Sequence, residues 1–413
     1  MTSAHMKFPR LLSATLLLAV QWLNPLCAQV MMSHAPATHS SVGACDSPEL
    51  SCANAASPAL LSNGTLLLVW TAGGAVSVAK SFDWGKTFEP RVQIAEHQKF
   101  LDTGGDARAQ IVAVEDGHVM VAYGYFKDAH WNAKVNMAVS SDGAEHFSEV
   151  KDLIKTGQSE RFPVLALQSN HRVSLAWIDK RVVAQKNKSG KVALGGSIAY
   201  TQTSDWGQTF KKEIIVNPES CECCRIGLVI DSKDQAFLAY RAIFPGGVRD
   251  HAIQSVSEKL QPSLVFRVSD DHWQTDVCPH QGPSLSVSDE EVLHVTWFTQ
   301  GSNRKGLYYA HSLDGGRSFS EPLKIGNPEF NPSRGHVLSK GKAVWLVWKE
   351  FDGEKSSLNM MFSKDQGKSW STKTELMTTL GYSDHPLLVQ SGQQIFVSWL
   401  TRLDGYRLML LDH

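Results

Sequence analysis

One eight-residue pattern recurs along the chain and constrains the fold more than any other feature. It reads S-x-D-x-G-x-[ST]-[FW] and covers residues 81–88, 203–210 (with threonine first), 312–319 and 363–370. A weaker fifth copy at 140–147 keeps Asp142 and Phe147. An aspartate that accepts turn N–H groups, a glycine with positive φ and an aromatic plug for the next sheet together predict a β-hairpin tip. Such repeats indicate an array of similar units.

A second repeat sets the number of units. Seven short apolar strands end in an aromatic residue: Trp70, Tyr123, Trp177, Tyr240, Trp297, Trp348 and Trp399. Successive aromatics lie 53, 54, 63, 57, 51 and 51 residues apart, about the length of one four-stranded propeller blade. We therefore predict an all-β, seven-bladed β-propeller over residues 57–413, with six blades as the alternative.

The two ends of the chain carry separate expectations. The last unit stops after a third strand at residues 407–411, so the segment 29–56 is expected to supply the outer strand and close the ring. Residues 1–28 are typical of a signal peptide, because Lys7 and Arg10 precede an apolar run at 11–23 and Leu26-Cys27-Ala28 precedes Gln29. No later run is apolar enough to span a membrane. We expect a monomeric protein, periplasmic or secreted.

The charge balance argues against nucleic acid as a partner. The chain has 40 basic and 41 acidic residues, for a net charge of −1. A nucleic-acid-binding domain usually carries a clear basic excess. The partners expected instead are a small ligand, a glycan or a metal ion.

The cysteines fall into two groups. Cys45 and Cys52 are close enough in sequence to form a local disulfide. Residues 221–224 place three thiols within four positions, and the next unit opens with Cys278-Pro279-His280 at a similar distance before its aromatic-ended strand. Thiolates beside an imidazole suit Cu(I) or Zn²⁺. Structural disulfides and redox-active thiols are the alternatives.

Other polar residues stand at similar positions near the first strands of their units. Inner strands of a propeller converge on its channel, where ligand sites form. The residues expected to share this funnel are Arg108, Arg161, Cys224, His280, His336 and His385. Two neighbouring segments, Asp384-His385-Pro386 and Arg249-Asp250-His251, are expected close by. For each residue alone, a hydrogen-bonded structural role is the alternative.

The eight-residue copies resemble the Asp-boxes of the sialidase (BNR-repeat) superfamily, over essentially the whole mature chain. A closer resemblance is to an exported bacterial sialidase-like group with a CxCC motif. It rests on SCECCR (220–225), GGVRDH (246–251), RVSDDHW (267–273), CPHQGP (278–283), WKEFDG (348–353) and SDHP (383–386). The resemblance implies the propeller fold and a shared Cys/His site, and it implies no substrate.

Sialic acid hydrolysis would require three arginines around a carboxylate, a tyrosine nucleophile activated by a glutamate, and an aspartic acid. Arg161-Phe162-Pro163 imitates the first arginine motif of sialidases, but it lies in the third unit instead of the first. Tyr382-Ser383-Asp384 imitates the tyrosine segment, and Asp102 or Asp106 is placed to be the acid. The catalytic candidates are therefore Tyr382, Arg108 and Arg161, with Arg334 or Arg249 as a further arginine.

Three functions follow from these patterns. The favoured hypothesis is an exported propeller that binds a ligand or a soft metal ion, copper first and zinc second. Its metal ligands would be Cys221, Cys223, Cys224, Cys278 and His280, and its ligand-binding residues Arg249, Asp250, His251, His336, Asp384 and His385. The alternatives are an exo-α-sialidase-type glycoside hydrolase and a non-catalytic protein-interaction propeller whose cysteines act as disulfide staples.

Overall fold

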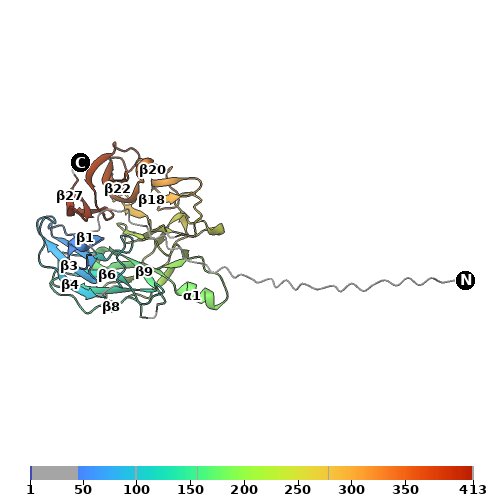
Figure 1. The fold of residues 1–413 in the computed structure, drawn as a ribbon, viewed down its shortest axis with the longest axis horizontal. Coiled ribbons are helices and arrows are strands. Elements are labelled where there is room, and N and C mark those ends of the chain that lie inside the picture. Colours follow the sequence, from blue (N-terminus) through green and yellow to red (C-terminus); the bar gives the residue numbers. More distant parts are fainter. Residues whose placement is uncertain (2–44, 98–99, 156, 278, 412–413) are drawn as a thin grey trace. The chain divides into compact units, whose positions relative to one another are not determined.

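Seven antiparallel sheets are arranged as the blades of a β-propeller, which confirms the predicted fold (Figure 1). The computed structural model describes Met1 and residues 45–97, 100–155, 157–277 and 279–411. Six sheets have four strands and the seventh has three, and in each sheet strands consecutive in sequence are neighbours. The chain therefore completes one blade before it begins the next.

Each blade starts with an inner strand and continues outward. The inner strands are β1 (Ala56–Leu60), β5 (Gln110–Ala113), β9 (Glu160–Leu167), β13 (Gly227–Ile230), β17 (Ser284–Val287), β21 (Ser333–Lys340) and β25 (Leu387–Ser391). The second strands are β2 (Leu66–Ala72), β6 (Val119–Phe126), β10 (Val173–Asp179), β14 (Ala236–Arg241), β18 (Leu293–Gln300), β22 (Ala343–Phe351) and β26 (Gln394–Thr401).

The third strands are β3 (Ala75–Ser81), β7 (Ala133–Ser140), β11 (Gly196–Thr203), β15 (His251–Val256), β19 (Lys305–Ser312), β23 (Ser356–Ser363) and β27 (Gly405–Leu410). The outer strands are β4 (Val92–Glu96), β8 (Lys151–Asp152), β12 (Ile214–Ser220), β16 (Phe266–Arg267), β20 (Leu323–Ile325) and β24 (Thr374–Thr379). The helices are α1 (Arg181–Lys188), η1 (Leu50–Cys52), η2 (Ser169–His171), η3 (Pro245–Gly247) and η4 (Pro328–Phe330). None in these ranges is long and apolar enough to cross a membrane.

The repeated aromatics occupy one position in all seven second strands and are buried between blades. A buried indole needs a partner for its N–H, and the blades supply one. Nε1 of Trp297 donates to Asp271 at 2.7 Å, and Nε1 of Trp348 donates to Glu350 at 2.9 Å. The seven-fold pattern in the sequence is therefore a pattern of core packing.

The eight-residue repeats form the turns between third and fourth strands. In blade 6, Asp365 accepts the backbone N–H of Ser369 at 2.8 Å, and Ser363 Oγ accepts the N–H of Gly367 at 2.8 Å. Gly367 has φ +82°, as the pattern predicts. Trp370 meets Tyr309 edge-on at 4.8 Å, so the aromatic plugs into the preceding blade and not into the following one.

Blades 1 and 7 meet through contacts that close the ring. The N–H of Ala56 donates to Asp384 at 3.0 Å, and Trp84 packs on Phe396 with ring centres 4.3 Å apart. The predicted disulfide between Cys45 and Cys52 is confirmed. Blade 7 has three strands among the described residues. Most of the segment predicted to add a fourth, residues 29–44, lies outside them, as do residues 2–28 of the predicted signal peptide, so both remain predictions.

The up-and-down order of the strands divides the loops between two edges of the propeller. The turns that carry the eight-residue repeats all lie at one edge, which we call the octad edge. The loops that precede the inner strands, and those between second and third strands, lie at the opposite edge, which we call the mouth edge. Every candidate site residue described by the structure belongs to the mouth edge.

Candidate functional site

The inner strands of all seven blades surround a central cavity of about 240 Å³. Asp106, Arg108, Arg225 and His336 line it, together with apolar and uncharged polar residues of the inner strands. Arg108 and Arg225 each stand two residues before an inner strand, β5 and β13. The cavity therefore opens at the mouth edge through a ring of charged side chains.

Two irregularities at the starts of inner strands accompany further arginines of the mouth. The pairing of β9 with β10 shifts register beside Phe162, which has φ +55°. The pairing of β21 with β22 shifts in the same way across Arg334, which has φ +59°. Bulges of this kind re-aim side chains and are frequent next to functional sites. Here they set Arg161 against Asp102 and Arg334 against Asp106, at 2.6 and 2.8 Å.

Arg108 of blade 2 and Asp384 of blade 7 form a buried ion pair beside blade 1. Arg108 Nη2 donates to Asp384 Oδ1 at 2.6 Å, and its Nη1 donates to the carbonyl of Ala56 at 3.0 Å. Burial raises the pKa of the Asp384 carboxyl, and the Arg108 charge opposes that rise. The ion pair and the bond to the Ala56 carbonyl therefore connect blades 1, 2 and 7 at the mouth.

Arg225 lies at the centre of a second network. Its Nη1 approaches Asp106 at 3.3 Å and His385 Nδ1 at 3.1 Å, and its Nη2 donates to the carbonyl of Gly335 at 3.1 Å. Burial lowers the pKa of Arg225 to about 10. Asp106 thus faces two guanidiniums, those of Arg225 and Arg334. A carboxylate shared in this way leaves positive charge in excess.

The charged groups of the mouth sum to a positive site. The cations are Arg108, Arg161, Arg225, Arg334 and Lys349, and the carboxylates are Asp102, Asp106 and Asp384. Five positive charges less three negative charges leave a formal charge of two. A positive, partly enclosed site attracts anions.

The two imidazoles of the mouth are neutral. Burial, reinforced by the nearby arginines, lowers the pKa of His336 to about 3 and that of His385 well below its usual value. Because a guanidinium only donates, Nδ1 of His385 accepts from Arg225, which leaves the proton on Nε2. Nδ1 of His336 accepts the N–H of Leu388 at 3.2 Å, so its proton is also on Nε2. Both rings can therefore donate a neutral hydrogen bond.

Lys349 and Tyr382 are two more ionisable groups at the mouth. Lys349 Nζ donates to the carbonyl of Ser383 at 2.7 Å, and burial lowers its pKa to about 8. Tyr382, the candidate nucleophile, is half exposed beside this loop. A lysine with a pKa near neutrality can exchange a proton under physiological conditions.

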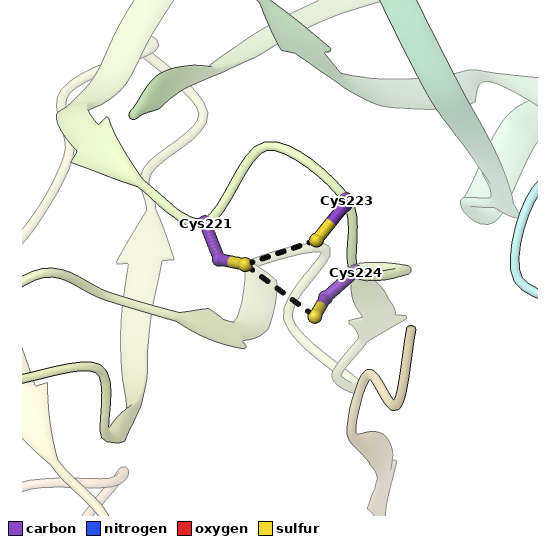
Figure 2. Close-up of side chains that lie close together, drawn as sticks. All are labelled: Cys221, Cys223 and Cys224. Atoms are coloured by element: carbon purple, nitrogen blue, oxygen red, sulfur yellow. Dashed lines mark hydrogen bonds between the residues drawn. The ribbon is translucent and has the colours of Figure 1, made fainter. Parts of the chain in front are cut away.

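A separate cluster of three cysteines lies in the loop between β12 and β13. Figure 2 shows the sulfurs of Cys221, Cys223 and Cys224 turned toward one another. Cys221 Sγ is 3.4 Å from Cys223 Sγ and 3.6 Å from Cys224 Sγ, and all three thiols are buried. The three sulfur atoms lie within 4.8 Å of one another, which suits ligands of one metal ion. Cys224 directly precedes Arg225, so this cluster borders the mouth.

The Arg249-Asp250-His251 segment lies against the same cluster. Arg249 Nη1 is 3.9 Å from Cys221 Sγ. Asp250 accepts the N–H groups of His272 and Trp273 at 3.0 and 3.1 Å, which is a structural role. His251 is buried, its pKa is held well below the usual value by burial, and neither ring nitrogen has a hydrogen-bond partner in the described part of the chain.

His280, the other predicted metal ligand that the structure describes, stands apart from this group. His280 is exposed, and its backbone carbonyl accepts from Arg334. It is not among the residues whose donor atoms cluster with the three sulfurs. Cys278 lies outside the described residues. The proposed Cys/His ligand set therefore remains a prediction, and the part described by the structure is its three-cysteine core.

Sequence reasoning overlooked three residues of this region: Arg225, Lys349 and Arg241. Arg225 had a readable signal, because it stands two residues before its inner strand, as Arg108 and His385 do. Lys349 and Arg241 sit at or near the ends of second strands β22 and β14. Their roles depend on burial, which no local pattern in the sequence reveals.

No protein-family model and no curated protein matches the chain. Among solved structures, the chain is similar to a PL25 ulvan lyase bound to -[GlcA(1-4)Rha3S]-, with a TM-score of 0.54, 10% identity and coverage of 86% of this chain and 93% of the lyase. The polysaccharide lyase Uly1 gives 0.52 at 8% identity, covering 87% and 90%. The Hadza microbial sialidase Hz136 gives 0.50 at 11% identity, covering 86% and 74%. The chain thus shares its fold with sialidase and polysaccharide lyase propellers.

Proposed function

We propose that the protein binds an acidic carbohydrate at the mouth of its channel, with a sugar carboxylate held by Arg225 and Arg334. The observation that carries this proposal is that both guanidiniums share the single carboxylate of Asp106. Arg334 meets that carboxylate, and the carbonyl of His280, through Nη1. Within the described ranges no bond of its Nε or Nη2 is seen, which leaves these donors for a planar anion, the geometry that guanidinium groups recognise best.

The similar solved structures support a carbohydrate as the ligand. The ulvan lyase is bound to a fragment that contains GlcA, a sugar with a carboxylate. The neutral imidazoles of His336 and His385 add N–H donors that suit sugar oxygens. A site of arginines and neutral donors fits an acidic sugar better than an isolated inorganic ion.

Eliminative cleavage is the reaction that this set of groups serves best. In such an elimination the base takes the proton next to the sugar carboxylate, a C=C bond forms, and the C–O bond to the leaving sugar breaks, with the proton returned to the leaving oxygen. The step requires a cation on the carboxylate and a base with a pKa near neutrality. Arg225 and Arg334 supply the cation, and Lys349, with its pKa lowered to about 8, supplies the base. Sialidase-type hydrolysis, the second candidate, would use Tyr382 with an aspartic acid. Asp102 and Asp106 are both ion-paired with arginines, which disfavours them as proton donors.

A binding panel tests the proposal. The mature protein is titrated with uronate-containing polysaccharides, a neutral polysaccharide of similar size and a sialylated oligosaccharide, with calorimetry as readout. Arg225→Met and Arg334→Met should each weaken binding of the best acidic ligand by about 10–100-fold, the effect of losing a charged hydrogen bond. Arg317→Met, an exposed arginine at the octad edge, is the matched control and should bind as the unchanged protein does.

Turnover is then measured on the same ligands. Elimination gives an unsaturated product that absorbs in the ultraviolet, and Lys349→Met should abolish it while binding persists. Release of a fluorophore from a sialoside, lost in Tyr382→Phe, would favour the sialidase reaction instead. Equal affinity of Arg225→Met and the unchanged protein for every acidic ligand would overturn the proposed site.

A further inference from the structure

The three cysteines have the spacing of ligands to one ion. Cys221 Sγ lies 3.4 and 3.6 Å from the other two sulfurs. A metal–sulfur distance of about 2.3 Å places two sulfurs of one ion about 3.8 Å apart at the tetrahedral angle and about 4.0 Å apart at the trigonal angle. The short loop after β12 therefore brings the sulfurs almost to coordination distance without rearrangement (Figure 2).

The charges around the cluster favour anionic sulfur. Arg241 is fully buried and donates to the carbonyls of Arg249, Gln281 and Phe298 at 3.0–3.1 Å. It makes no ion pair with a carboxylate anywhere in the described ranges, and its Nε has no hydrogen-bond partner there. Its guanidinium also lies over the Trp273 ring, 4.2 Å from the ring centre. Even so, a buried guanidinium without a counter-anion is unfavourable. A negatively charged sulfur close by would compensate it.

The backbone register places Arg241 beside the cluster. Cys221 N–H donates to the Arg241 carbonyl at 2.8 Å, and the bridge between Ser220 and Ala242 sets Cys221 opposite Arg241. On the other side of β14, Arg241 pairs with His251 of β15. Arg249 Nη1 approaches Cys221 Sγ at 3.9 Å. The Arg249 guanidinium therefore lies beside Cys221 Sγ, and the backbone of Arg241 lies directly opposite Cys221.

We propose that Cys221 and Cys224, with Cys223 beside them, bind a soft metal ion of the Cu(I) type. Thiolates without carboxylate or imidazole ligands select soft ions, and Cu(I) accepts a low coordination number. Two thiolates on Cu(I) leave one negative charge, which the positive charge of Arg249 beside Cys221 offsets. The site is independent of the proposed carbohydrate site.

The test is a Cu(I) titration of the mature protein (residues 29–413) under anaerobic conditions, in competition with a chromophoric Cu(I) chelator. One Cu(I) per chain is expected. Cys221→Ser and Cys224→Ser should each weaken binding by more than about 100-fold, since loss of a supporting group beyond the ligands already weakens metal sites about 10–100-fold. Arg249→Met, which removes such a supporting charge, should weaken it about tenfold.

Glu222→Gln is the matched control, because Glu222 lies in the same loop and pairs with Lys180 at 2.9 Å, outside the thiol cluster. It should bind Cu(I) as the unchanged protein does. X-ray absorption of the copper-loaded unchanged protein needs no variant and should show sulfur neighbours at about 2.3 Å. Three results would overturn the proposal: a Cys221–Cys224 disulfide in the protein as purified that resists reduction, absence of sulfur around the copper, or equal Cu(I) affinity in Cys221→Ser.

Discussion

The two edges of the propeller are built in opposite ways. At the octad edge, each turn satisfies its own polar groups within a few residues, as Asp314 does with the N–H of Ser318 at 2.9 Å. At the mouth edge, partners come from distant blades: Arg108 and Asp384 are 276 residues apart, and Arg334 and Asp106 are 228 apart. The octad edge is built from five copies of a local turn. The mouth forms only when the ring closes and brings residues of distant blades together.

The two edges are therefore expected to serve different purposes, stability at the octad edge and ligand binding at the mouth. An octad turn follows the ordinary rules for turns, with a glycine at positive φ and an aspartate that accepts N–H groups. Non-glycine residues with positive φ occur at both edges, for example Gln366 in an octad and Arg334 at the mouth. The mouth differs in that its charged side chains are largely buried and pair across blades. Departures of this kind concentrate at functional sites. We therefore expect octad substitutions to change stability alone and mouth substitutions to change binding first.

The largest effect is expected at Gly105, in the loop before β5. A Cβ at this position would lie 2.7 Å from Nε2 of His385, so Gly105→Ala must displace the imidazole that Arg225 contacts. Affinity for the best acidic polysaccharide should fall about 100-fold, as small displacements of positioning groups can do. The free energy of unfolding should change by less than about 1 kcal/mol, because the ring can rotate away.

Gly104→Ala is the control for this prediction. No atom lies within 4 Å of a Cβ built on Gly104, and its φ is not in the left-handed region. Both variants change the same loop by one methyl group. If Gly104→Ala and Gly105→Ala bind equally well in calorimetric titrations, His385 has no role in binding.

The second effect concerns stability at the octad edge. A Cβ on Gly367 would overlap the hydroxyl of Tyr309, with a separation of 1.8 Å, and Gly367 has φ +82°. Gly367→Ala should therefore lower the free energy of unfolding by about 2–4 kcal/mol, from backbone strain and overpacking together. Binding at the mouth should be unchanged.

Gly315→Ala separates those two causes. Gly315 also has positive φ, +72°, but a Cβ there would meet nothing within 4 Å. Only the strain remains, and a loss of about 1 kcal/mol is expected in denaturant unfolding. Equal losses in the two variants would show that crowding against the preceding blade does not matter.

The sequence predicted the two edges with unequal success, for a physical reason. The octads and the seven aromatics are local signals, so they predicted the fold. The Cys45–Cys52 disulfide was also predictable, because the two cysteines lie close together in the sequence. The positions of Arg108 and His336 near their inner strands suggested a place at the channel, and both residues line the cavity. Arg225 and Lys349 were missed because their importance depends on burial and on cross-ring partners. Those depend on ring closure and on β-bulges, which leave little trace in any one segment.

The smallest expected effect is a difference in how the edges respond to pH. At the mouth edge, Glu160 begins β9 with both carboxylate oxygens fully buried and without hydrogen-bond partners in the described part of the chain. Burial raises its pKa from 4.5 to about 7, although Lys134 lies 3.6 Å away. At the octad edge, hydrogen bonds from Ser318 lower the pKa of Asp314 from 3.8 to about 2.

These shifts act at opposite ends of the pH range. Between pH 4.5 and 7 the folded state holds a proton on Glu160 that the unfolded state has lost, so stability falls as the pH rises through this window. Asp314 contributes stability above its usual pKa, and that contribution is lost as the pH falls from about 4 toward 2. Glu160→Gln should remove the loss between pH 4.5 and 7 and leave the acid side unchanged. Asp314→Asn should alter only the acid side.

Denaturant unfolding of both variants across this range measures the slope of the free energy of unfolding against pH. A Glu160→Gln slope equal to that of the unchanged protein would mean that Glu160 is ionised in the folded state. Because the comparison uses slopes, it is unaffected by the cost of burying the glutamine amide, which does not vary with pH.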